Sequence, residues 1–536
     1  MTDDLVRRIL NEVERRELPL LTWGVTDGTL TEAELEAIIS TTAPNEDPDE
    51  ILDEMLQRRL IASQGLSDKR YRSRMAETVR LATTLRQWFH GRPWITAPEL
   101  VSDSRFLSRP RVVPRRDRST KDLSAALRET LGVAWTDKHQ GPLDAILGDR
   151  KVSDFQARAT IRLLKPMAGP QATMIAAGTG AGKTLSFYLP VLTHLLATDK
   201  PSGTPRVLAI YPRTELLRDQ LRALLSTIDD LSRGGHRAPT VGVLYGAVPI
   251  SRADAEAGKR GWTRRTAGLV CPILDCLMPN CTGSLIWSTE AGDSEVLDCD
   301  KCGYRITGDR LHFTRRGLQA NPPEVLFTTT EMLNRQLGST SMRRLLVGTS
   351  KAAPEYILLD EVHTYSGTHG AQVANLLRRW RSELSAPPHI VGLSATLSDP
   401  VGFFADLVGL PTSGVGLIAP ASYEMQEIGR EYFLALRGDP ASQASLLSTT
   451  IQTAMLLRRM LDPAPREPSQ GTFGSRVFVF TDDLDVTNRL HSQLEDAEGW
   501  QPGGTNRKPG GSLATLRASS TSGDTRARES AVLLGR

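Results

Sequence analysis

The sequence lacks any run of 18 apolar residues, so we expect no membrane-spanning helix. Its N-terminus is charged at Asp3 and Asp4, where a secretory signal would have a basic start and an apolar core. We therefore expect a cytoplasmic protein. A large excess of one charge is also missing: the net charge of +3 over 536 residues identifies no class of partner.

Cysteine is absent from all but one short stretch, since all five cysteines lie between residues 271 and 302. In a reducing compartment such clustering indicates metal binding rather than disulfides. The run CDKCG at 299–303 resembles a zinc-ribbon knuckle, which four thiolates would complete. One cysteine is then spare, and an iron–sulfur cluster is the competing metal group. The predicted zinc ligands are Cys276, Cys281, Cys299 and Cys302, with Cys271 as the rival of Cys276.

A glycine-rich loop follows the short apolar run 172–176 and precedes an amphipathic helical stretch, 185–196. A phosphate-binding loop requires this order of strand, loop and helix. Its backbone N–H groups point at phosphate oxygens, and the helix N-terminus adds positive potential. We expect Lys183 to reach the β- and γ-phosphates and Thr184 to hold Mg²⁺. The predicted nucleotide-binding loop consists of Ala177, Gly178, Thr179, Gly180, Ala181, Gly182, Lys183 and Thr184.

From about residue 121 onward, predicted helices alternate with short apolar strands, a pattern typical of a parallel α/β sheet. Polar residues repeatedly follow these strands, at the edge where parallel sheets bind ligands. The polar segments that follow strands are 212–215, 246, 328–331, 360–363 and 394–396. We therefore predict an α/β fold with its ligand site at the carboxyl ends of the strands.

An ordered set of motifs resembles those of superfamily 2 helicases of the DEAD/DEAH type. It comprises Gln156, the loop 177–184, YPRTELL from 211, TTTEML from 328, DEVH from 360 and SAT from 394. The segments DEVHTYSGTHGAQVANLLRR and LSATLSDP are most similar to the Lhr/MrfA-like group, and the chain also resembles phage-defence or DNA-modification-cluster helicases such as the DpdJ type. The resemblance implies two RecA-like domains, of which the second is incomplete.

The expected domain boundaries follow from this resemblance. Residues 1–120 form a helical, winged-helix-like module with a basic aromatic segment. Residues 121–410 form the first RecA-like domain, a P-loop parallel sheet domain with a Cys-rich, zinc-ribbon-like insertion at 262–312. Residues 411–536 form the incomplete second RecA-like domain, beginning with a strand at 476–482.

The resemblance also implies roles at the nucleotide site, where ATP and Mg²⁺ are the expected cofactors. Asp360 would reach Mg²⁺ together with Thr184, and Glu361 would orient and deprotonate the attacking water. His363 would link the nucleotide site to the motif that couples hydrolysis to strand movement. That coupling motif consists of Ser394, Ala395 and Thr396. Gln156 resembles the glutamine that reads the adenine edge, with Phe155 as its packing partner.

A second set of residues corresponds to segments that grip the backbone of a single strand. These residues are Pro212, Arg213, Thr214, Glu215, Gly246, Thr328, Thr329, Thr330 and Glu331. Backbone N–H groups, hydroxyls and a guanidinium suit phosphate recognition without base readout. DNA is the favoured partner, single-stranded or duplex with a loading strand, and RNA is the alternative.

The N-terminal region leaves two alternatives open. Its first 65 residues contain three charged helical stretches and a short apolar strand, which resemble a winged-helix module that contacts nucleic acid or only packs against its neighbour. Between residues 69 and 121 arginines and lysines outnumber acids. The aromatic residues among them are Tyr71, Trp88, Phe89, Trp94 and Phe106. Such interleaving suits a nucleic-acid strand, and a solvated basic face over a core of aromatics is the alternative.

One expected motif is missing. No segment resembles Gln-x-x-Gly-Arg-x-Gly-Arg, which in the family supplies arginines to the ATP site from the second domain. We therefore expect an ATP-dependent helicase or translocase that is weakly active by itself. A downstream chain or domain would complete the second RecA-like domain. The alternatives are an RNA-directed ATPase and an ATP-binding nucleic-acid scaffold.

Overall fold

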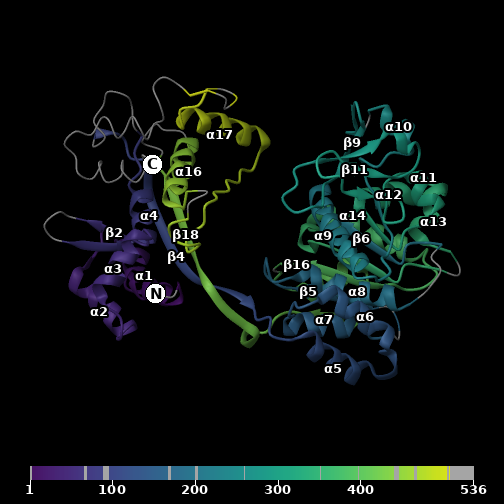
Figure 1. Ribbon diagram of the computed structural model, residues 1–536, viewed down its shortest axis with the longest axis horizontal. Coiled ribbons are helices and arrows are strands. Elements are labelled where there is room, and N and C mark those ends of the chain that lie inside the picture. Colours follow the sequence, from purple (N-terminus) through teal and green to yellow (C-terminus); the bar gives the residue numbers. More distant parts are fainter. Residues whose placement is uncertain are drawn as a thin grey trace. The chain divides into compact units, whose positions relative to one another are not determined.

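The computed structural model describes residues 3–64, 69–87, 96–166, 169, 171–198, 203–258, 260–349, 352–395, 397–439, 446–463, 467–501, 503 and 506–507. The chain divides into two compact units. Unit 1 comprises residues 1–111 and 429–536, and unit 2 comprises residues 112–428. The boundaries fall inside two paired strands, β4 (Val101–Pro114) and β18 (Met425–Gly438) (Figure 1).

Unit 2 is organised around an eight-stranded sheet whose neighbouring strands are all parallel. Its spatial order is β13-β7-β14-β6-β15-β16-β5-β17. The strands are β5 (Gln171–Ala176), β6 (Val207–Tyr211), β7 (Val241–Leu244), β13 (Leu311–His312), β14 (Val325–Thr329), β15 (Tyr356–Leu359), β16 (His389–Ser394) and β17 (Val415–Ile418). The predicted α/β fold with a parallel sheet is confirmed.

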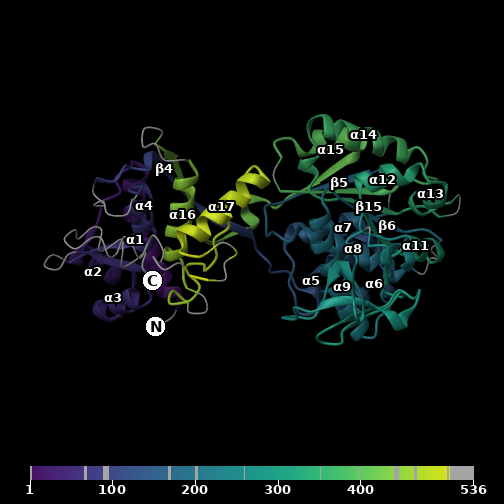
Figure 2. The same ribbon diagram turned by 90° about the horizontal axis from the view of Figure 1, so that it is seen from above.

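Helices cover both faces of this sheet, and a hydrophobic core lies under each layer (Figure 2). One layer contains α5 (Thr120–Leu131), α6 (Asp137–Leu147), α7 (Asp154–Leu164), α8 (Lys183–Ala197) and α9 (Thr214–Arg233). The other contains α12 (Thr330–Leu337), α13 (Thr340–Val347), α14 (Gly367–Arg381) and α15 (Pro400–Val408). Because side chains alternate along a strand, β5 contributes Ile175 to the first core and Met174 to the second.

An antiparallel five-stranded sheet is inserted between β7 and β13, within the predicted Cys-rich insertion. Its strands are β8 (Thr263–Arg265), β9 (Gly268–Asp275), β10 (Ser284–Ser288), β11 (Leu297–Cys299) and β12 (Arg305–Ile306), and the short helices α10 (Arg252–Glu256) and α11 (Arg315–Ala320) flank it. Polar contacts tie it to α9. Arg222 Nη2 donates to the Cys276 carbonyl at 2.9 Å, and Tyr304 and Arg310 both donate to Asp229.

The N-terminal part of unit 1 consists of helices and a three-stranded sheet. Its elements are α1 (Asp3–Thr22), β1 (Leu30–Thr31), α2 (Glu32–Thr42), α3 (Pro48–Gln57), β2 (Ile61–Gln64) and β3 (Arg70–Ser73), with the strands in the order β1-β3-β2. The exposed side chains of α3 include Asp49, Glu50 and Asp53. Acidic side chains repel phosphates, so α3 is unsuited to a DNA backbone. This favours the alternative in which the module only packs against its neighbours.

The aromatic residues of the basic segment belong to the core wherever the structure describes them. Tyr71 is 2% exposed and Phe106 is 4% exposed. Arg74, at the start of α4 (Arg74–Thr83), is also buried and pairs with Asp462 at 2.8 Å. The core interpretation therefore holds for these residues. Trp88, Phe89 and Trp94 lie outside the described residues.

The segment after residue 410 differs in two places from the expectation. β17 extends the first parallel sheet, beside β5, beyond the boundary predicted at residue 410. The apolar run 476–481 is not a strand, although α17 (Leu484–Ala497) follows it and α16 (Leu446–Met460) precedes it. A strand needs a neighbour for its backbone hydrogen bonds, and none of the described residues pairs with this run. Phe478 and Phe480 are consequently 74% and 89% exposed.

None of the described helices is both long and apolar enough to cross a membrane.

Unit 1 contains a buried acid that makes its stability depend on pH. Burial raises the pKa of Glu14 from 4.5 to about 7, although the Tyr432 hydroxyl donates a hydrogen bond to it. The folded state therefore holds this proton between pH 4.5 and 7 while the unfolded state releases it. Stability falls as pH rises through that window, by about 3 kcal/mol for a shift of this size.

We expect Glu14→Gln to remove most of this dependence and to raise the stability of unit 1 at pH 8. Urea unfolding midpoints at pH 5 and pH 8 measure the effect. Glu12→Gln on the same helix is the control, because Glu12 forms a surface pair with Arg15 of little energetic weight. Equal pH dependence in wild type and Glu14→Gln would contradict the assignment.

Candidate nucleotide and nucleic-acid site

The predicted phosphate-binding loop connects β5 to α8. Gly180 and Gly182 have φ values of +79° and +89°, which side chains rarely adopt, and Gly182 caps the N-terminus of α8. Gly178, Thr179 and Gly180 are exposed, while Ala177 and Ala181 are buried beneath them. Lys183 and Thr184 form the first turn of α8. The loop therefore presents backbone N–H groups, an ammonium and a hydroxyl to one exposed surface.

Gln156 and Arg116 both contact this loop. Gln156 Nε2 donates to the Gly182 carbonyl at 3.0 Å, and its Oε1 accepts from Ser153 N at 2.9 Å. Arg116 Nη2 donates to the Gly180 carbonyl at 3.4 Å. A Cβ on Gly182 would lie 2.5 Å from Gln156 Nε2. Gln156 thus holds the loop in place here, and both ends of its amide are occupied.

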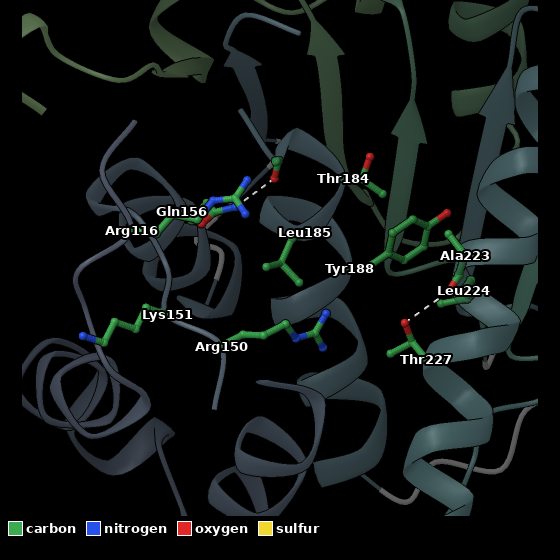
Figure 3. Close-up of a pocket in the computed structure, with 11 residues that line it drawn as sticks. Arg116, Arg150, Lys151, Gln156, Thr184, Leu185, Tyr188, Ala223, Leu224 and Thr227 are labelled. Carbon is green, nitrogen blue, oxygen red and sulfur yellow. Dashed lines mark hydrogen bonds between the residues drawn. The ribbon is translucent and has the colours of Figure 1, made fainter. Parts of the chain in front are cut away.

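A cavity of about 530 Å³ opens beside the loop (Figure 3). Its lining residues include Arg116, Arg150, Lys151, Gln156, Gly182, Thr184, Leu185 and Tyr188. Phe155, the predicted packing partner for adenine, does not line it. Phe155 is fully buried in the core under α7, so its ring is not accessible to a base.

The acid pair follows β15 at the same edge of the sheet. Asp360 is 6% exposed and accepts a hydrogen bond from Glu361 N at 2.8 Å. The pKa of Asp360 is raised to about 6, mainly by burial and also by the Glu361 charge, while the hydrogen bond from Glu361 N and the Lys183 ammonium act in the opposite direction. Glu361 has a φ of +46°, a strained conformation for a side-chain-bearing residue. A buried carboxylate with a raised pKa, within electrostatic range of Lys183, suits a divalent cation, which would offset its charge.

Ser394 brings three predicted motifs together at the end of β16. His363 Nδ1 lies 3.1 Å from Ser394 Oγ and 3.2 Å from Glu361 Oε2. The Ser394 carbonyl accepts from Ala177 N, at the start of the phosphate loop, at 3.2 Å. The phosphate loop, the DEVH segment and the SAT segment are thus in direct contact. Ala395 is partly buried beside Ser394, and Thr396 lies outside the described residues.

The predicted nucleic-acid residues follow β6, β7 and β14, which are neighbours in the sheet. Pro212 and Thr214 are partly buried, and the exposed members are Arg213, Glu215, Gly246 and Glu331. Two helices begin here, α9 after Arg213 and α12 after Thr329. The Thr329 hydroxyl caps α12 by accepting from Met332 N at 3.2 Å.

Two of the predicted threonines are placed for structural roles. Thr328 is fully buried, and its hydroxyl donates to the Leu244 carbonyl at 2.8 Å. Thr330 is 8% exposed. The Thr328 hydroxyl is therefore not available to a nucleic-acid strand in this conformation.

Four cysteines of the insertion converge on one point. The Sγ atoms of Cys276, Cys281, Cys299 and Cys302 all lie within 4.8 Å of one another. Two pairs are separated by 3.4 Å and 3.7 Å, close to the roughly 3.8 Å that tetrahedral thiolates with Zn–S bonds of about 2.3 Å would give. Gly283 N and Lys301 N donate to Cys281 and Cys299. This arrangement fits a structural zinc ion.

Cys271, the rival ligand, is not part of this cluster. It is buried at 5% exposure, and burial raises the pKa of its thiol to about 11. The structure thus decides between the two cysteines that their spacing left open.

Sequence reasoning did not identify Arg116 or Tyr188 as part of the site. Arg116 lies in a proline-containing segment whose composition indicated only an extended connection. Tyr188 lies five residues after Lys183, at an ordinary core position of an amphipathic helix. No local signal marks either residue, because their contacts come from elements far apart in the sequence.

The ligand assignment predicts different outcomes for two cysteine variants. We expect Cys271→Ser to retain one equivalent of bound zinc, while Cys276→Ser loses most of it, because only Cys276 belongs to the four-thiolate cluster. Metal analysis of the purified proteins measures zinc content. The thermal unfolding midpoint should fall for Cys276→Ser alone. Equal zinc loss in both variants would show that the cluster is not the metal site.

Comparisons with known proteins agree with this geometry. Residues 153–257 and 290–402 match the DEAD/DEAH box helicase family. The chain is 29% identical to Druantia protein DruE of Escherichia coli strain UMEA 4076-1, over 45% of this chain and 16% of DruE. It is 27% identical to a Lhr helicase/probable uracil glycosylase of Mycolicibacterium smegmatis, over 42% of this chain and 11% of that protein.

Among solved structures, the DUF1998 helicase MrfA bound to DNA is similar, with 18% identity and a TM-score of 0.40. The match covers 68% of this chain and 36% of that chain. The chain therefore spans well under half the length of these relatives. Residues 153–257 and 290–402 thus resemble DEAD/DEAH box helicases, and they contain the phosphate loop, the DEVH segment and the SAT segment that meet at one edge of the parallel sheet.

Proposed function

We propose that this chain binds Mg-ATP and uses its hydrolysis to move along nucleic acid, with DNA as the favoured substrate. One observation carries the proposal: the nucleotide residues and the exposed nucleic-acid residues follow neighbouring strands of one sheet. The nucleotide residues follow β5, β16 and β15. The exposed nucleic-acid residues follow β6, β14 and β7. The two sets of loops adjoin at the neighbouring strands β15 and β6, about 4.8 Å apart, so a movement of one set can displace the other.

At the nucleotide side, the charges of the chain define the roles. The loop 177–182 cradles phosphates with its N–H groups, and Lys183 neutralises their charge. Thr184 and Asp360 hold Mg²⁺, which screens the phosphates from the acids. Glu361 stands next to Asp360 with its carboxylate 31% exposed, which suits it to orient a water molecule and accept its proton.

His363 and Ser394 connect this chemistry to movement. The imidazole contacts both Glu361 and Ser394, so a change in the charge of Glu361 alters a hydrogen bond to the end of β16. Ser394 in turn accepts from the phosphate loop through Ala177 N. These contacts support a coupling role for the 394–396 segment.

At the nucleic-acid side, Arg213 and the N-termini of α9 and α12 support phosphate binding. Helix N-termini offer free N–H groups and positive potential, and Arg213 adds a charge at the start of α9. Neither helix start reads a base edge. This fits a motor that tolerates any sequence.

We further propose that the segment 476–481 and α17 belong to a second RecA-like domain. The run VFVF is apolar on both faces, as a central parallel strand is, yet its phenylalanines are exposed here. An added parallel strand would bury them. The same addition would bring arginines to the ATP site from across the cleft.

The competing functions are an RNA-directed ATPase and an ATP-switched scaffold that binds nucleic acid without efficient turnover. ATPase assays with single-stranded DNA, duplex DNA and RNA separate them. Stimulation by RNA alone would replace the DNA proposal. Nucleic-acid binding with no stimulation by any of the three would favour the scaffold.

Purified 1–536 should bind Mg-ATP but turn it over slowly, on the order of 10⁻² s⁻¹ or less. Arginines supplied from a second domain contribute about 10³–10⁵ in rate in other phosphoryl-transfer enzymes, and no such motif occurs in this sequence. Steady-state phosphate release with saturating single-stranded DNA measures the rate. Brisk, DNA-stimulated turnover would contradict this expectation.

Two variants test whether the residual hydrolysis belongs to this site. Lys183→Ala should lose both nucleotide binding and hydrolysis, since the ammonium contacts the phosphates. Glu361→Gln should keep nucleotide binding and lose hydrolysis, because the amide cannot accept a proton. Activity that survives in both variants would come from a contaminant.

The pathway is a separate proposal. We favour anti-phage defence over DNA repair, on the resemblance to helicases of defence and DNA-modification clusters. Cells that carry the intact gene should lower phage plating efficiency by at least about tenfold relative to cells with Lys183→Ala. Equal plating with increased sensitivity to DNA damage in the variant would favour repair.

A further inference from the structure

Three aromatic rings connect the nucleotide cavity to the two nucleic-acid segments through the first core of unit 2. Tyr188 lies on α8 and lines the cavity beside the phosphate loop (Figure 3). Tyr211 is the last residue of β6 and immediately precedes Pro212. Phe327 lies in β14 and immediately precedes Thr328. α8 begins at the phosphate loop, while β6 and β14 end at the two nucleic-acid segments, so each ring belongs to an element that borders one of these loops.

The two tyrosines are joined by a hydrogen bond between their hydroxyls, 2.7 Å apart. Tyr211 is fully buried and Tyr188 is 7% exposed. Both rings belong to the same hydrophobic core. Because an unsatisfied buried hydroxyl is costly, each tyrosine fixes the orientation of the other.

Phe327 packs against both tyrosines. Its ring centroid lies 5.5 Å from that of Tyr211 and 6.4 Å from that of Tyr188, with interplanar angles of 10° and 9°. Three nearly parallel rings in a close-packed core cannot tilt independently. A displacement of α8 therefore displaces the ends of β6 and β14.

The negative charge of Asp360 acts on both hydroxyls of the tyrosine pair. Burial raises the pKa of Tyr188 and Tyr211, and the negative charge of Asp360 raises the pKa of both further. Both phenols consequently stay neutral, and their hydrogen bond persists across the working pH range. Their polar ends lie within electrostatic range of the carboxylate that would hold Mg²⁺.

We propose that Tyr188, Tyr211 and Phe327 are positioning residues that transmit nucleotide occupancy to the nucleic-acid loops at 212–215 and 328–331. Nucleotide binding shifts the first turns of α8, the hydroxyl pair passes the shift to β6, and ring stacking passes it to β14. The inference rests on the proposed function, because it needs one site for ATP and one for nucleic acid. None of the three residues touches a substrate phosphate.

The measurable quantity is the ratio of single-stranded DNA affinities with and without a non-hydrolysable ATP analogue. Coupling of this kind changes affinity by about fivefold or more. We expect that ratio in wild-type 1–536, and a ratio below about twofold in the double variant Tyr188→Phe/Tyr211→Phe. Fluorescence anisotropy of labelled DNA gives the ratio. Titration of the analogue alone gives the nucleotide affinity of each protein, so that every ratio is measured at a saturating concentration of analogue.

The double variant removes both hydroxyls, so it leaves no buried donor without a partner and keeps the rings. Each single variant leaves the hydroxyl of the other tyrosine without its partner, and it should therefore lower the thermal unfolding midpoint more than the double variant does. Phe327→Leu, which breaks the stack, should also lower the ratio. Tyr356→Phe is the matched control: it deletes a buried hydroxyl that donates to the Leu163 carbonyl at 2.9 Å, at the start of β15.

The possible outcomes distinguish the coupling role of the three rings from the proposed ATP-driven function. A wild-type ratio in the double variant would overturn the inference alone. A lowered ratio in Tyr356→Phe as well would also overturn it, because the effect would then be general destabilisation. If wild-type DNA affinity does not respond to nucleotide at all, the proposed function and the inference fail together.

Discussion

Parallel hydrogen bonding among β5, β16, β15 and β6 is the constraint on which the rest of unit 2 depends. In a parallel sheet the carboxyl ends of all strands lie at one edge. The loops that follow neighbouring strands therefore lie close together because of the strand pairing, whatever the sequences of the loops. Asp360 and Ser394 are 34 residues apart along the chain, and the phosphate loop precedes both by more than 170 residues, yet these segments follow the neighbouring strands β15, β16 and β5. The hydrogen bond from Ala177 N to the Ser394 carbonyl joins the ends of β5 and β16 directly.

Burial at this edge determines the chemistry. Asp360 follows an apolar strand, and burial raises the pKa of its carboxyl group. A bound cation would offset the charge of the carboxylate. Glu361 occupies a strained backbone conformation that aims its carboxylate away from the core and toward His363. The Asp360 charge also acts on the buried tyrosine pair, so the carboxylate and the rings proposed to link the two sites influence one another electrostatically.

Much of this was predictable from local sequence patterns. The glycine spacing of 177–184 and the acid pair after an apolar strand identify their elements because each has a strict local requirement. The parallel α/β class follows from strand and helix alternation for the same reason. Local patterns were less informative where a residue's role depends on distant partners: Phe155 resembled a base-stacking residue but is core, and Thr328 resembled a phosphate contact but bonds to Leu244. The run 476–481 has strand composition and no strand neighbour among the described residues.

The sequence by itself determined the nucleotide loop, the acid pair and the clustering of cysteines, since each is encoded by residue types at short, fixed spacing. Only the tertiary structure decided that Cys276 rather than Cys271 joins the four-thiolate cluster, because that choice depends on which Sγ atoms meet in space. The same holds for Arg116 against Gly180 and for Tyr188 against Tyr211. Such contacts join elements far apart in the chain, and no spacing in the sequence records the distance between two side chains across a folded core.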